Sequence, residues 1–236
     1  MKKSSYVGLL PFYLLALIIC VALAGWGSSA VTTSVQNTPV NRTFTVIIDA
    51  GHGGIDGGAT SCTGILESAF NLQIAMKLND LLHLLGYDTV MIRTTDTSIY
   101  TEGNSIAAQK VSDLKERVRI VNDTENAVLI SIHQNTFSDS RYSGPQVFFA
   151  ETAGSKALAE MLQSKLNSSL APESKRTVKK AESVYLLQNI QKTGVLIECG
   201  FLSNPGEEAK LRDRGYQQEL VAVIAAGLTE FFHSAS

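Results

Sequence analysis

Three strongly apolar runs in this chain each lead to an ionisable residue. They are residues 46–48 before His52, residues 128–132 before His133, and residues 195–197 before Glu198. Strands that are apolar on both faces are typical of a parallel sheet whose two faces are covered by helices. Because ligands bind outside the carboxyl ends of the strands in such sheets, the three ionisable residues are candidates for a single site.

Amphipathic segments alternate with the apolar runs. In the first, residues 66–86, apolar side chains recur at helical spacing and Gly86 provides a stop signal. The other expected helices are residues 114–122, 155–170 and a C-terminal helix that includes residues 216–231, and the further expected strands are residues 87–93, 146–150 and 183–187. This alternation predicts an α/β fold: a single open, mostly parallel, twisted sheet with helices on both faces.

The N-terminal part of the sequence carries an apolar segment. Lys2 and Lys3 precede an almost uninterrupted apolar run over residues 7–26, which is about the length that a helix needs to cross a bilayer. We expect residues 1–27 to be a signal peptide or membrane anchor helix, residues 28–42 to be a flexible linker, and residues 43–236 to be the folded domain. Lysines before the run predict that the domain is exported across the cytoplasmic membrane and is anchored or secreted on its outer side.

Charge and cysteine content exclude several classes of protein. The net charge of −2 provides no basic surface for nucleic acid, so no nucleic-acid partner is expected. Cys20 lies in the N-terminal apolar segment, which leaves Cys62 with Cys199 as the pair in the domain that can form a disulfide. Neither cysteine has CxxC spacing, so a cysteine-based zinc site is not expected.

His52, Glu67 and His133 are candidate metal ligands. His52 lies in a turn of glycines that leaves its imidazole accessible, although a histidine fixed by simple backbone contacts is the alternative. Glu67 lies three residues before Phe70 and seven before Ile74, on the helix stripe that faces the sheet, although the helix dipole also favours an acid in a first turn. An inward carboxylate needs a cation, and two histidines with one glutamate are the ligand composition of a catalytic zinc site that binds one ion.

Glu198 has two interpretations. Beside a metal site it can serve as the general base of a hydrolysis reaction. It can equally be a strand-end carboxylate that supports the site, and spacing alone does not separate the two. The remaining histidines, His83 in a leucine-rich helix and His233 near the C-terminus, are interpreted as structural or solvated.

Several motifs along the domain match one family of enzymes. They are Ile47-Ile48-Asp49-Ala50-Gly51-His52-Gly53-Gly54-Ile55-Asp56-Gly57-Gly58-Ala59, Glu67 with Asn71-Leu72, Arg93-Thr94-Thr95-Asp96, residues 114–117, Ser131-Ile132-His133-Gln134-Asn135, and residues 197–204. With these motifs, residues 44–232 resemble the zinc-dependent N-acetylmuramoyl-L-alanine amidases of bacterial cell walls. The resemblance implies that His52, Glu67 and His133 bind one zinc ion, that Glu198 is the catalytic glutamate, and that residues 43–236 form a zinc amidase catalytic domain. It also implies the substrate, the peptidoglycan amide between N-acetylmuramic acid and L-alanine of the stem peptide.

Within this family the chain looks most like the sporulation and germination amidases that act on spore cortex peptidoglycan. The cues are residues 100–112, the Arg141-Tyr142-Ser143-Gly144 turn, and Tyr185-Leu186-Leu187-Gln188-Asn189. This subgroup implies a step towards muramic lactam, with a deacetylase acting downstream. It also implies a location in the sporulating cell or the forespore intermembrane space, where an accessory sporulation protein is a possible partner.

Two other kinds of function are compatible with the same residues. Another zinc-dependent wall hydrolase, a peptidase or a deacetylase, would use the same two histidines and glutamate. A non-catalytic wall-binding or partner-binding protein would have a site that has decayed, but all four chemical positions here hold residues able to act.

We predict that a protein shortened to begin at Asn41 folds and is soluble, because the patterned α/β sequence starts just after it. Circular dichroism and thermal unfolding of the shortened protein measure this. An insoluble product, with only the full-length chain folding, would show that the domain boundary is misplaced.

Overall fold

The computed structural model describes residues 44–234, which form an α/β fold around one six-stranded sheet. The strands are β1 (Thr45–Ala50), β2 (Asp88–Met91), β3 (Ala127–Asn135), β4 (Gln146–Phe149), β5 (Lys179–Lys180) and β6 (Thr193–Phe201). Their order across the sheet is β2-β1-β3-β6-β4-β5. The long strands β1, β3 and β6 are neighbours in the middle of the sheet, as expected for the three apolar runs.

The sheet is mixed. Strands β2, β1, β3 and β6 are parallel to one another, and β4 pairs with β6 in the antiparallel direction. The prediction of a mostly parallel sheet is confirmed, with this one reversal. Because β3 and β6 are parallel and in register, His133 lies directly opposite Glu198.

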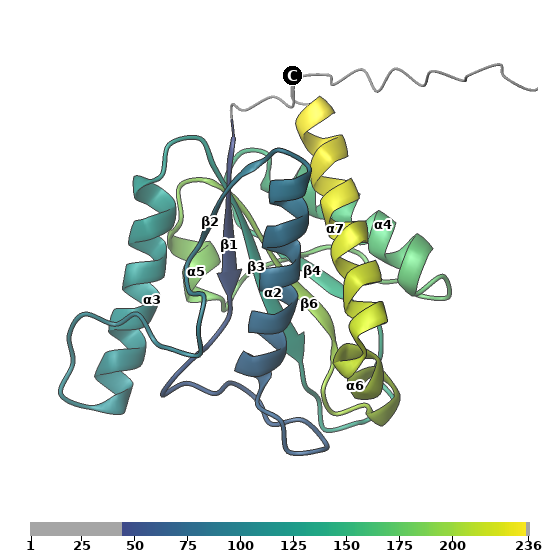
Figure 1. Ribbon diagram of the computed structural model, residues 1–236, viewed down its shortest axis with the longest axis horizontal. Coiled ribbons are helices and arrows are strands. Elements are labelled where there is room, and N and C mark those ends of the chain that lie inside the picture. Colours follow the sequence, from purple (N-terminus) through teal and green to yellow (C-terminus); the bar gives the residue numbers. More distant parts are fainter. Residues whose placement is uncertain (1–43, 235–236) are drawn as a thin grey trace, which may run out of the picture. The chain divides into compact units, whose positions relative to one another are not determined.

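Helices cover both faces of the sheet (Figure 1). They are α2 (Glu67–Leu84), α3 (Ile106–Asp123), α4 (Ser155–Leu170), α5 (Tyr185–Asn189), α6 (Pro205–Arg212) and α7 (Arg214–Ser234). One face of the sheet packs against α2, α4 and α7, and the other packs against α3 and α5. The helices on both faces that the sequence predicted are therefore present.

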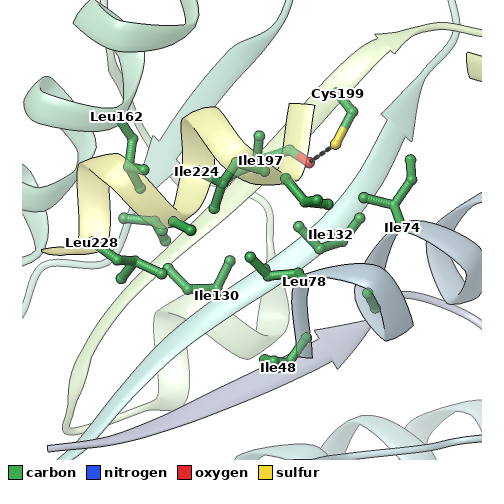
Figure 2. Close-up of a cluster of buried hydrophobic side chains, with 14 of the residues drawn as sticks. Ile48, Ile74, Leu78, Ile130, Ile132, Leu162, Ile197, Cys199, Ile224 and Leu228 are labelled. Carbon is green, nitrogen blue, oxygen red and sulfur yellow. Dashed lines mark hydrogen bonds between the residues drawn. The ribbon is translucent and has the colours of Figure 1, made fainter. Parts of the chain in front are cut away.

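The two cores follow the alternation of side chains along each strand. Ile48, Ile130 and Ile197 point into the larger core, where Leu78 of α2 and Ile224 of α7 meet them (Figure 2). The residues next to them in sequence, such as Leu129 and Leu196, point into the smaller core under α3 and α5. Each central strand is thus buried on both faces, which fixes its register and the position of its carboxyl end.

Two predicted elements differ from the structure. Residues 183–187 were expected to form a strand, but Tyr185–Asn189 is the short helix α5. Leu186 and Leu187 are adjacent in sequence and are both buried in the same core, which a strand would not allow because its neighbouring side chains face opposite ways. Helix α3 begins at Ile106 rather than near Leu114, with the Ser105 side chain accepting from the Ala108 N–H as its cap, and the turns before Leu114 are largely exposed.

The predicted membrane segment and linker lie outside the described residues. Among residues 44–234, no helix has both the length and the apolar character needed to cross a membrane.

Candidate metal centre and catalytic edge

The turn that follows β1 carries His52 and is held by two buried arginines. Arg93 donates from Nε to the Ala50 carbonyl oxygen at 2.8 Å and from Nη2 to the Gly51 carbonyl oxygen at 3.0 Å. Arg117 of α3 donates from Nη2 to the His52 carbonyl oxygen at 2.8 Å. Both arginines are 3% exposed, so three successive carbonyl groups at the end of β1 are satisfied without water.

Arg117 is compensated by carboxylates. It forms a buried ion pair with Asp49 and a second pair with Asp113, 2.6 Å from Nε to Oδ2. Burial raises the pKa of Asp49, but the charge of Arg117 and a hydrogen bond from Ser131 outweigh it and hold this pKa below its usual range. A guanidinium buried without such partners would be strongly destabilising.

Glu67 lies in the first turn of α2 and is 4% exposed. Its Oε2 accepts from the Ala59 backbone N–H at 3.0 Å, and its Oε1 accepts from the Gln134 backbone N–H at 3.1 Å and from Asn71 Nδ2 at 3.2 Å. Burial raises the pKa of Glu67, but hydrogen bonds with His133 and His52 outweigh it and keep this pKa well below its usual range. The carboxylate is therefore ionised and faces the two imidazoles.

The two histidines approach Glu67 from the turn after β1 and from β3. His52 Nε2 lies 3.3 Å from Glu67 Oε2, and His133 Nδ1 lies 3.0 Å from Glu67 Oε1. The imidazole rings meet edge to face, with centroids 4.9 Å apart. Burial lowers the pKa of His52, but hydrogen bonds and charge from Glu67 and Asp56 raise it to about 9. The cluster therefore favours positive charge at its centre.

Two glycines permit this close approach. A Cβ at Gly51 would lie 2.1 Å from His133 Nε2. A Cβ at Gly58, where φ is +70°, would lie 2.7 Å from both Glu67 Oε2 and His52 Cδ2. Side chains at these two positions would displace the candidate ligands, which explains why the turn is built from glycine.

The donor set fits a zinc ion. One ligand atom from each of His52, Glu67 and His133 lies within 4.8 Å of the others. Two imidazole nitrogens with one carboxylate match a catalytic zinc site that keeps an open position. Two of the three side chains are also oriented by other groups, as metal ligands usually are: Asp56 contacts His52, and backbone N–H groups hold Glu67.

Glu198 lies beside this cluster without joining it. It is half-buried, and its Oε2 has no hydrogen-bond partner among residues 44–234. Burial raises its pKa to about 7, with Glu67 adding to the rise and the two histidines opposing it. A pocket of about 340 Å³ is lined by residues of α3 and α5 and by Glu198, His52 and His133. A carboxylate that can exchange a proton near neutral pH thus faces a space large enough for part of a substrate.

All four predicted site residues therefore lie together, in the turn after β1 and on α2, β3 and β6. Cys62 and Cys199 are both free, and no cysteine among the described residues joins the metal cluster. Sequence reasoning assigned no role to Arg93, Arg117 or Asp56, although each falls in or beside a matching motif. Their roles depend on contacts between distant segments, so only the motif positions could have indicated them.

Comparison with known proteins identifies the family. The family model described as N-acetylmuramoyl-L-alanine amidase matches residues 46–230. The germination-specific N-acetylmuramoyl-L-alanine amidase of Bacillus subtilis is 35% identical over 189 residues, covering 79% of each chain.

Solved structures agree with this. The CwlD amidase from Clostridioides difficile, in complex with the GerS lipoprotein, superposes with a TM-score of 0.77 at 35% identity, covering 81% of this chain and 99% of that one. An N-acetylmuramoyl-L-alanine amidase from Clostridium difficile 630 superposes with a TM-score of 0.72 at 32% identity, covering 83% of this chain and 100% of that one.

We predict that Arg93→Met lowers the free energy of unfolding by about 2–4 kcal/mol, because it removes one buried charged donor from each of the carbonyl groups of Ala50, Gly51 and Ser68. Urea unfolding measures this. Arg119→Met is the control: Arg119 is exposed on α3 and pairs only with surface acids, so little change is expected. Equal effects of the two substitutions would contradict the role given to Arg93.

Proposed function

The chain belongs to the N-acetylmuramoyl-L-alanine amidase family, and we propose that it is a zinc-dependent hydrolase of the amide between N-acetylmuramic acid and L-alanine in peptidoglycan. The observation that carries the proposal is the His52, Glu67 and His133 cluster with Glu198 beside it in the lining of a pocket. The matching family, whose description names this amide, supports the choice of bond.

The donor set assigns each side chain a task. His52, Glu67 and His133 would hold the ion, which supplies Lewis acidity towards the substrate carbonyl and favours attack by water at neutral pH. Glu198 lines the pocket beside the cluster, and its carboxylate would accept a proton from the attacking water. The same carboxyl group then donates that proton to the leaving amino group of L-alanine, which completes hydrolysis of the amide.

Burial raises the pKa of Glu198, which suits this side chain both to accept and to donate a proton. A carboxyl group with a pKa of about 7 both takes and gives a proton readily near neutral pH. The buried Glu67, by contrast, stays ionised and is suited to hold a cation. Two glutamates in one site are thus separated in function by their surroundings.

The biological setting is part of the proposal. The likeness to the germination-specific amidase supports spore cortex peptidoglycan as substrate and a step towards muramic lactam, with a deacetylase acting next. The apolar residues 7–26 support export across the cytoplasmic membrane, with the enzyme anchored or secreted on the outer side in the sporulating cell. The complex between the CwlD amidase and the GerS lipoprotein supports an accessory partner for this chain as well.

We predict that the full-length chain binds one zinc ion, and that alanine at His52, Glu67 or His133 lowers zinc content and amidase activity together. Each substitution removes one of three ligand atoms. Elemental analysis and mass spectrometry of digested peptidoglycan measure the two quantities. His83→Ala, a histidine that contacts Thr89 on the surface, should change neither.

The products of the digestion test the bond. Peptides that begin with free L-alanine support an amidase. Release of acetate, or cleavage that leaves the lactyl amide intact, would contradict the proposal and indicate a deacetylase or a peptidase instead.

We predict that Glu198→Gln keeps its zinc while turnover falls by roughly two to four orders of magnitude, because glutamine keeps the size of the side chain but cannot accept the proton. Steady-state kinetics on zinc-loaded protein measure the loss. Glu125→Gln, an exposed acid just before β3, is the matched control and should retain full turnover. Full activity of Glu198→Gln would place the base elsewhere, and loss of zinc would make Glu198 a ligand.

A further inference from the structure

Both ring nitrogens of His52 have a carboxylate partner. His52 has a φ of +60°, in the left-handed region that non-glycine residues seldom adopt, and its side chain is half-buried. One nitrogen, Nε2, faces Glu67 Oε2 at 3.3 Å. The other, Nδ1, lies 2.7 Å from Asp56 Oδ2. A carboxylate can only accept a hydrogen bond, so Nδ1–H donates to Asp56 Oδ2, and Nε2 is the nitrogen that would hold the ion in place of its own proton.

Asp56 is itself held in place by the turn. The Gly53 N–H donates to the Asp56 carbonyl oxygen at 2.7 Å, and the Asp56 N–H donates back to the Gly53 carbonyl oxygen at 3.1 Å. Ser98 Oγ donates to the same Gly53 carbonyl oxygen at 2.7 Å, which ties the turn to the loop after β2. The backbone therefore presents the Asp56 carboxylate to His52 in one arrangement.

The second oxygen of Asp56 is bound by a cation from a different element. Lys110 Nζ of α3 lies 2.7 Å from Asp56 Oδ1, and the two side chains are 45% and 30% exposed. Burial raises the pKa of Asp56, but Lys110 and His52 outweigh it and lower this pKa below its usual range. Lys110, Asp56 and His52 all line the pocket at the candidate metal centre.

We propose that Asp56 is a positioning residue for His52, and that Lys110 is the cation that keeps Asp56 in place. Their contacts form a chain from α3 through Asp56 to Nδ1 of His52, which directs Nε2 towards the ion. The affinity of the site for zinc thus depends on a helix that supplies no ligand. This inference rests on the proposed metal centre, and it adds two residues that act through His52.

Zinc affinity of the full-length chain, measured by competition with a chelator, tests the proposal. Asp56→Asn should raise the zinc Kd about 10- to 100-fold, the usual effect of removing a partner that orients a ligand. Lys110→Gln should raise it about two- to fivefold, because the pair is partly exposed, and Lys110→Arg should restore the wild-type Kd. Asp139→Asn, whose acid pairs with Arg141 in a surface loop, and Lys115→Gln on α3 are the matched controls and should leave the Kd unchanged.

A spectroscopic measurement separates positioning from a general loss of structure. In zinc-loaded wild-type protein and in Lys115→Gln, the ¹H–¹⁵N spectrum should show a slowly exchanging proton on His52 Nδ1. In Asp56→Asn this proton should exchange quickly or shift, while the backbone spectrum is retained.

Three results would overturn the proposal. The first is that Asp56→Asn has the wild-type zinc Kd although His52→Ala binds zinc weakly. This result would support the metal centre but contradict the role given to Asp56. The second is an equal effect of Asp56→Asn and Asp139→Asn. The third is a wild-type zinc Kd in His52→Ala, which would overturn the metal centre as well.

Discussion

Two buried guanidinium groups hold the turn from which His52 projects, and the rest of the site depends on them. The chain leaves the sheet after β1, so the carbonyl groups of residues 50–52 cannot all bond to a neighbouring strand. Arg93 and Arg117 donate to these groups instead. A buried, unsatisfied carbonyl costs about 1–3 kcal/mol, and a buried arginine is tolerated only beside an acid such as Asp49. The position of His52 is thus set by segments more than 40 residues apart in the sequence.

The other candidate ligands are held by the same kind of contact. Glu67 receives hydrogen bonds from backbone N–H groups on both sides, and His133 is fixed because β3 is buried in the middle of the sheet. The protein backbone therefore positions Glu67 and His133, and the carboxylate of Glu67 in turn contacts the His133 ring. Glu198 differs, because burial is not matched by hydrogen bonds and one oxygen stays unpartnered. In the proposed function, Glu67, whose oxygens accept hydrogen bonds, binds the ion. Glu198, which has an oxygen unpartnered within residues 44–234, transfers the proton.

The sequence predicted the parts of this structure that follow from local pattern. Apolar strands such as residues 128–132 and the inward helix stripe of Glu67 follow from burial on one or both faces, so the central strands and the meeting of four candidate residues at their carboxyl ends were accessible. The start of α3 was not, since the turns before Leu114 are mostly exposed and contribute little to the core. Helix α5 was taken for a strand, since five residues are too few to separate the two periods. Lys110 and Asp56 are 54 residues apart, and no pattern in either segment indicates that contact.

The central claim is that one zinc ion is held by His52, Glu67 and His133 at the carboxyl edge of the sheet. Crystals of the zinc-loaded chain, measured on both sides of the zinc absorption edge, test it most directly. The account predicts a single anomalous peak in contact with both imidazoles and the Glu67 carboxylate, with Glu198 nearby but outside bonding distance. A peak at any other cluster, or one bonded to Glu198 in place of Glu67, would contradict it.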